Sequence, residues 1–136
     1  MVHFLRSSLI VIKSSPRLAG ALSWVLALII IVLSLTPLQQ LPEVPGGDKT
    51  HHLIAYAALA FPNALARPGK IFFFGLIYAG LGGGIELIQP YANRYGSWLD
   101  FAANLGGVSI GTVCGLYLAR YLARYPDGHT PEQHHS

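Results

Sequence analysis

The chain has 136 residues, of which 52% are hydrophobic and 11% charged, and its formal net charge is +3. A soluble domain carries about 25% charged residues, so the composition excludes an ordinary soluble domain and indicates a membrane protein. The nine Lys and Arg residues form no run, and the chain carries no nucleic-acid-binding motif, so we expect no nucleic-acid partner.

Four apolar segments approach the roughly 20 helical residues that a bilayer core of about 30 Å requires. In chain order they are Leu18 to Leu35, Thr50 to Ala66, Ile71 to Ile88 and Phe101 to Ala119. The first is too long for a secretory signal, and no A-x-A-like cleavage site follows it, so we expect a retained anchor. The second is the weakest because it is short and contains Pro62, which a buried helix tolerates. We predict an all-α membrane protein with four transmembrane helices packed as a small bundle.

The basic residues predict the orientation of this bundle. Two of them, Lys49 and Arg94, fall on one side of a four-pass arrangement, and seven fall on the other: Arg6, Lys13, Arg17, Arg67, Lys70, Arg120 and Arg124. The positive-inside rule then puts both termini in the cytoplasm. We divide the chain into a cytoplasmic N-terminal segment (1–17), a transmembrane domain (18–122) and a polar cytoplasmic tail (123–136) that we expect to be disordered.

The unusual polar residues gather at the opposite, outer side. They form three stripes at helical spacing: Asp48, His52 and Tyr56; Glu86 and Gln89; Asp100 and Asn104. Ionisable groups inside a membrane normally face a bundle interior or an aqueous cleft, so we predict that the three stripes converge. Glu86 lies about 4 to 5 Å below Gln89 along its helix. It is therefore shallow enough to reach water and deep enough to be partly desolvated.

Glu86 allows two interpretations. As a structural group it would pair with Arg94, Lys49 or a histidine and hold the helices together. As a functional group it would contact a ligand or handle a proton, and beside histidines it could act as a general acid or base.

A metal site is a competing interpretation of the same residues. Nitrogen and oxygen ligands suited to zinc are available from His51, His52, Glu86 and Asp100. Adjacent histidines on a helix point about 100° apart, so only one of them can readily join a shared pocket. The sequence also lacks an H-E-x-x-H motif. From the sequence we therefore expect no metal and no other cofactor.

Small residues recur every four positions on the last two apolar segments. They are Gly75, Ala79 and Gly83 on the third segment, and Gly107, Gly111 and Gly115 on the fourth. Such faces let helix backbones approach closely in lipid. We expect these two segments to pack tightly together within the chain, and a homodimer through the glycine faces is the second option.

Two blocks, DKTHHLIAY and ELIQPYANRYGSWLDFAANLGGVSIG, resemble the VanZ-like family of small bacterial membrane proteins over about residues 45 to 120. The matching positions are Asp48, Lys49, His52, Tyr56, Glu86, Gln89, Arg94, Ser97, Asp100, Asn104, Gly107 and Gly111. The resemblance implies a multi-pass protein of the bacterial cytoplasmic membrane that is concerned with the cell envelope. The family is named for a protein associated with resistance to the glycopeptide antibiotic teicoplanin. The resemblance supplies no reaction.

Together these patterns predict an outer-leaflet pocket that engages a membrane lipid or a lipid-linked envelope precursor. Its cations would bind phosphate or carboxylate, its amides would orient the ligand, and its carboxylates would position the cations or handle a proton. The expected ligand-binding residues are Asp48, Lys49, His52, Tyr56, Glu86, Gln89, Arg94, Ser97, Asp100 and Asn104. Two alternatives stay open: an acid/base enzyme whose catalytic candidates are His52, Glu86 and Asp100, and a structural or assembly partner in a membrane complex.

Overall fold

The computed structural model describes residues 1–37 and 47–124, without the side chains of Val2, His3 and Asp48. Within these ranges the chain is helical and contains no strand. The helices are α1 (Val2–Ser14), α2 (Pro16–Leu35), α3 (Asp48–Ala66), α4 (Ile71–Ile88) and α5 (Trp98–Arg124), with 3₁₀ turns η2 (Pro68–Lys70) and η3 (Gln89–Ala92). The predicted disordered tail lies outside the described residues, except for Ala123 and Arg124, which end α5.

Three helical stretches of the described chain are long and apolar enough to cross a membrane: Pro16–Leu35, Pro68–Ala92 and Trp98–Arg124. The chain is therefore an all-helical membrane protein with three candidate spans. The second predicted segment does form a helix, α3, but α3 is not among the three. Its first turns contain Lys49, His51 and His52, and these polar residues lower its mean hydropathy.

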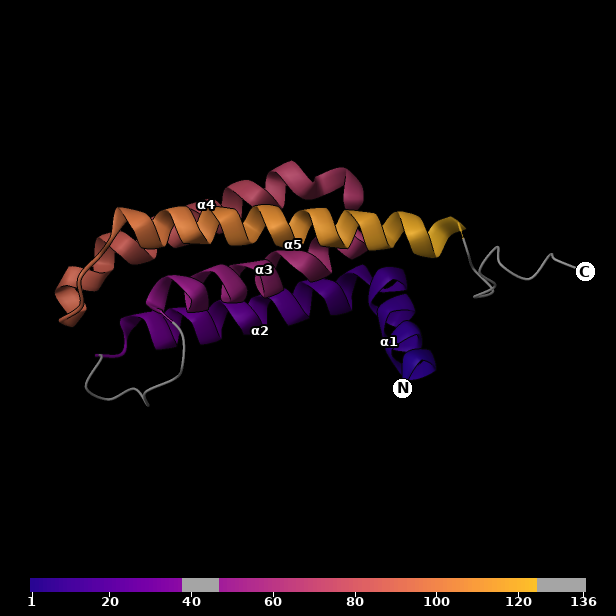
Figure 1. Cartoon of the computed structure of the whole chain (residues 1–136), viewed down its shortest axis with the longest axis horizontal. Helices are drawn as coiled ribbons and strands as arrows, with labels where there is room; N and C mark the ends of the chain where they lie inside the picture. Colours follow the sequence, from indigo (N-terminus) through magenta and orange to yellow (C-terminus); the bar gives the residue numbers. More distant parts are fainter. Residues whose placement is uncertain (38–46, 125–136) are drawn as a thin grey trace, which may run out of the picture.

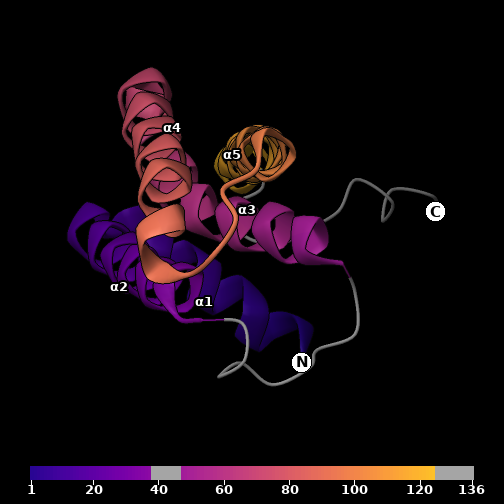
Figure 2. The ribbon, with the colours of Figure 1, turned by 90° about the vertical axis from the view of Figure 1, so that its left-hand side faces the viewer.

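The polar character of α3 is explained by its place in the fold. Figure 2 shows α3 at the centre, with α2 on one side and α4 and α5 on the other. The side chains of Tyr56, Leu59 and Leu65 on α3 are fully buried at 0% exposure. A helix that is enclosed by its neighbours presents little surface to lipid, so it needs less apolar surface than an outer helix.

The closest backbone contact in the bundle joins α3 and α5. A Cβ atom added at Gly111 would collide with the backbone of Ala57, and one at Gly115 would lie 2.7 Å from the Cβ of Ala64. The glycine face of α5 therefore packs tightly within the chain, but against α3 and not against α4 as the sequence suggested. The reason is that Ala57 and Ala64 of α3 face these glycines. Their small side chains let the two helix backbones approach closely.

The glycines of α4 do not form a comparable contact. A Cβ atom at Gly75, Gly80 or Gly84 would meet nothing within 4 Å among the described residues, and one at Gly83 would make an ordinary contact with Phe101. The homodimer option stays a prediction.

Both ends of the described chain lie at the same end of the bundle. Figure 1 shows α1 crossing the other helices there, beside the C-terminal turns of α5. The ammonium group of Lys13 on α1 donates a hydrogen bond to the carbonyl oxygen of Ala119 at 3.0 Å, and Leu9 and Ile12 pack against the buried cluster of Leu65, Ala119 and Leu122. The sequence analysis did not predict α1, because a 13-residue helix is too short to cross a membrane.

Candidate functional site

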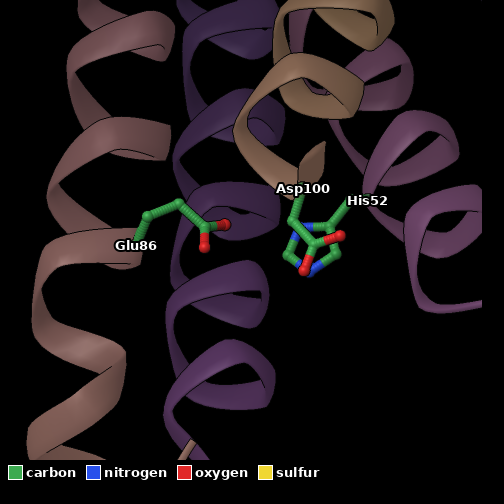
Figure 3. A group of neighbouring side chains, drawn as sticks. All are labelled: His52, Glu86 and Asp100. Carbon is green, nitrogen blue, oxygen red and sulfur yellow. The ribbon is translucent and has the colours of Figure 1, made fainter. Parts of the chain in front are cut away.

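Three ionisable side chains meet at the end of the bundle opposite α1. One ligand atom from each of His52, Glu86 and Asp100 lies within 4.8 Å of the other two. Figure 3 shows the carboxylate of Asp100 beside the His52 ring, with Glu86 pointing toward both from α4. One residue from each predicted polar stripe thus meets the other two, and His52 is the histidine that lies beside the two carboxylates.

The site has two layers because α3, α4 and α5 each contribute two positions one helical turn apart. The outer layer holds the three ionisable residues, and the deeper layer, about 6 Å away along the helices, holds Tyr56, Gly82 and Asn104. A Cβ atom at Gly82 would lie 3.1 Å from Nδ2 of Asn104 and 3.3 Å from the hydroxyl oxygen of Tyr56. Gly82 therefore makes room for the two polar side chains of the deeper layer.

The deeper layer orients His52. Nδ1 of His52 lies 2.9 Å from Oδ1 of Asn104. An amide oxygen can only accept a hydrogen bond, so Nδ1 must carry the proton. In the neutral imidazole the lone pair is then on Nε2.

Glu86 is held through only one of its oxygens. The backbone N–H of Ser97 donates to Oε2 of Glu86 at 2.8 Å. Gly96 allows this contact, because a Cβ atom at that position would collide with the backbone carbonyl of Glu86. The second oxygen, Oε1, is buried and has no hydrogen-bond partner in the described part of the chain.

Further buried polar atoms of the site have no hydrogen-bond partner among the described residues. They are the hydroxyl of Tyr56, Oδ1 of Asp100 and Nδ2 of Asn104, none of which has a hydrogen bond to a described residue. These side chains are deeply buried, at 0%, 6% and 0% exposure. A buried polar group without a partner costs about 1 to 3 kcal/mol. The site therefore contains several buried polar atoms that receive no hydrogen bond from, and donate none to, residues 1–37 and 47–124.

The two carboxylates add an electrostatic cost. Two negative charges about 4 Å apart repel by about 4 kcal/mol at the effective dielectric constant of about 20 that suits a protein surface. His52 is the third member of this group, with a ring nitrogen within 4.8 Å of an oxygen of each carboxylate.

Gln89 and Arg94 were expected in the ligand site, and the structure places both at the C-terminal end of α2. Nε2 of Gln89 donates to the carbonyl of Ser34 at 3.2 Å. Nη1 of Arg94 donates to the carbonyls of Leu33 and Thr36 at 3.3 and 3.2 Å. Donors at a helix C-terminus satisfy the carbonyls that have no partner within the helix. These bonds fasten the η3 turn and its loop to α2.

The remaining predicted residues surround the site. Lys49 is exposed and lies one helical turn from His52. Ser97 contributes its backbone N–H, while its hydroxyl accepts a hydrogen bond from the N–H of Leu99 at 3.2 Å. Asp48 begins α3, but its side chain lies outside the described part of the structure.

The sequence analysis missed a second buried polar cluster at the other end of α3, centred on Asn63. Nδ2 of Asn63 donates to the hydroxyls of Ser23 and Tyr78, at 2.9 and 2.7 Å. Its Oδ1 accepts from Nη1 of Arg67 at 3.2 Å, and Ser23 in turn donates to the carbonyl of Leu59 at 3.0 Å. The signal that could have found the cluster is a lone amide inside an apolar helix, since such a residue needs partners on other helices.

Comparisons of the chain with protein-family models, with curated proteins and with solved structures gave no match. The resemblance to the VanZ-like family therefore stays a prediction from the residues.

Proposed function

We propose that the chain is a four-pass protein of the bacterial cytoplasmic membrane that binds a lipid head group. Its ligand is the polar head of a membrane lipid or of a lipid-linked envelope precursor, and its binding site is the outer layer of His52, Glu86 and Asp100. The observation that carries the proposal is the set of buried polar atoms in this site that have no partner in the described chain. In this proposal α3 is the fourth crossing, enclosed by the three apolar helices.

The depth of the site fits a head group. His52 lies four residues after the start of α3, Glu86 two before the end of α4, and Asp100 two after the start of α5. Each is therefore within about 6 Å of a helix end. The polar heads of lipids lie at this level, and the acyl chains lie deeper.

The ligand chemistry follows from the unpaired atoms. Oε1 of Glu86 and Oδ1 of Asp100 accept hydrogen bonds, so the ligand needs hydroxyl or ammonium donors. The exposed ammonium group of Lys49 at the rim attracts phosphate. A head group that joins a phosphate to a hydroxyl or an amine has both features. The VanZ-like resemblance supports a role in envelope integrity or glycopeptide tolerance.

Native mass spectrometry in a mild detergent tests this proposal. We expect the wild type, purified from a bacterial membrane, to retain a discrete lipid mass that is at least about tenfold less abundant in Glu86→Gln. The control is Arg120→Gln, which removes an exposed charge at the opposite end of the bundle and should retain the lipid. Equal retention in all three proteins would place any bound lipid elsewhere. A folded wild type that retains nothing would contradict tight binding.

An acid/base enzyme is the second candidate, and the bond between His52 and Asn104 favours it. A neutral His52 that donates Nδ1–H to Asn104 carries its lone pair on Nε2, and Nε2 would be the atom that acts as the base. An enzyme would convert the lipid, so wild-type membranes should contain a product mass that is missing with His52→Gln. Unchanged lipid masses in both membranes would exclude turnover of the abundant lipids.

A further inference from the structure

The outer layer of the site has the composition of a metal centre as well as that of a head-group site. Its three side chains come from three different helices, and one ligand atom of each lies within 4.8 Å of the others. They supply one imidazole nitrogen and two carboxylate oxygens, a ligand set that suits zinc and related divalent cations.

Each carboxylate of this layer has one buried oxygen with no hydrogen bond to a described residue. Oδ1 of Asp100, on a side chain that is 6% exposed, has no hydrogen-bond partner among residues 1–37 and 47–124. Oε1 of Glu86 is also buried and has no hydrogen bond to a described residue. A divalent cation bound between these oxygens would neutralise the two charges and supply the missing partner of each oxygen.

Two of the three candidate ligands are also oriented in the way that metal ligands are. A metal-binding histidine nearly always donates its other ring N–H to an acceptor that fixes the ring, and His52 donates Nδ1–H to Asn104. Glu86 is fixed through Oε2 by the N–H of Ser97. In each case the hydrogen bond fixes the side chain through one atom, and the other polar atom of the side chain is the candidate ligand.

We infer that His52, Glu86 and Asp100 bind a divalent transition-metal cation of the zinc class, with Asn104 orienting His52. A tetrahedral zinc site has ligand atoms about 3.4 Å apart, given zinc–ligand distances of about 2.1 Å. The separations between the three ligand atoms, which are within 4.8 Å, therefore need to shorten by up to about 1.4 Å. Three protein ligands leave the fourth position for water or for an oxygen of a ligand. That a head-group oxygen fills this fourth position rests on the proposed function. The cation site itself does not rest on it.

Zinc titration of the full-length protein tests the inference. The protein is purified with a tag that contains no histidine, stripped with EDTA, and titrated with ZnCl₂ by calorimetry, with zinc counted by mass spectrometry after desalting. We expect one tightly bound zinc per chain. This binding should be lost in His52→Ala and in Asp100→Asn and be about 10- to 100-fold weaker in Asn104→Ala.

His51→Ala is the matched control, because the neighbouring side chain points about 100° away on the helix. It should bind zinc as the wild type does. Equal zinc affinity in His52→Ala and the wild type would overturn the inference, as would the loss of zinc in His51→Ala alone. Displacement of the zinc by an equal concentration of Mg²⁺ would overturn the choice of metal class, because Mg²⁺ prefers an all-oxygen octahedral shell.

A second measurement does not depend on the folding of any variant. X-ray absorption spectra of the zinc-loaded wild type should show a shell of nitrogen and oxygen at about 2.0 to 2.2 Å and no sulfur at about 2.3 Å. A sulfur shell would assign the zinc to Cys114, the only cysteine of the chain, and would overturn the inference.

Native mass spectrometry of zinc-loaded and EDTA-treated protein separates this inference from the proposed function. Zinc bound without any retained lipid supports the metal site and contradicts head-group binding. Lipid retained equally by both samples, with no zinc taken up, supports head-group binding and overturns the metal site.

Discussion

The two buried polar clusters on α3 differ in how completely their atoms are paired. Asn63 lies eleven residues after His52, about 16 Å farther along the helix axis. Both the oxygen and the nitrogen of its amide are hydrogen-bonded, to Ser23 on α2, to Tyr78 on α4 and to Arg67, which follows α3. In the outer site, Asn104 has a partner for its oxygen, but its nitrogen has none in the described structure.

This difference separates stability from function. A paired polar network in a membrane bundle holds helices together and specifies their register. Buried carboxylate and amide atoms that have no hydrogen bond to a described residue lower stability, and their presence is explained if a ligand completes them. Substitutions in the Asn63 cluster should therefore lower stability and leave ligand retention unchanged. Substitutions in the outer site should lower ligand retention without lowering stability.

The largest effect is expected from Gly111→Ala, because Gly111 lies at the close backbone contact between α3 and α5. The new methyl group would collide with the backbone of Ala57, so the helices must separate, at a cost of about 3 kcal/mol or more. We expect loss of folded, monodisperse protein on size exclusion in detergent. The control is Gly106→Ala, whose Cβ would make only an ordinary contact of 3.7 Å with Leu53. Equal yields of the two variants would show that the contact between α3 and α5 can accommodate a methyl group at Gly111.

Asn63→Ala should lower stability without affecting the outer site. It removes three interhelical or side-chain hydrogen bonds and leaves the hydroxyls of Ser23 and Tyr78 with fewer partners. We expect the free energy of unfolding, measured by SDS titration in mixed micelles, to fall by about 2 kcal/mol. Retention of lipid and zinc by the folded fraction should be unchanged. If ligand retention falls and stability does not, the assignment of roles to the two clusters is wrong.

Asp100→Asn should shift stability in the other direction. The substitution keeps the shape of the side chain and removes one of two neighbouring negative charges. In EDTA we expect the free energy of unfolding to rise by about 1 kcal/mol, measured by the same SDS titration. With zinc present the wild type should gain stability and the variant should not. A loss of stability in EDTA as large as that of Asn63→Ala would identify Asp100 as a structural residue.

The sequence predicted the parts of this site that depend on spacing along one helix. The third segment, Ile71 to Ile88, coincides with α4, and one residue of each stripe, His52, Glu86 and Asp100, does lie in the shared site. Spacing of four residues fixes which side chains share a face, whatever the tertiary structure. The polar character of α3 hid its central position, because hydropathy measures lipid exposure and not helix formation.

The sequence could not predict which helices meet. The glycines of α5 and α4 have the same spacing, yet only those of α5 lie against another backbone. The difference depends on which helix offers small residues at the same height, and that becomes known only when the helices are placed. The Asn63 cluster was missed for the same reason, since its partners Ser23 and Tyr78 are unremarkable as single residues.

The smallest effect, and the sharpest test of the outer site, is expected from Gly82→Ala. The added methyl group would lie 3.1 Å from Nδ2 of Asn104 and would move this side chain by a few tenths of an ångström, while alanine raises helix propensity by up to about 1 kcal/mol. These two effects offset each other in stability. Because Asn104 orients His52, ligand retention should nevertheless fall several-fold. The control is Gly80→Ala on the same helix, which faces open space and should gain stability at unchanged retention. Equal retention in the two variants would mean that the position of Asn104 does not control the site.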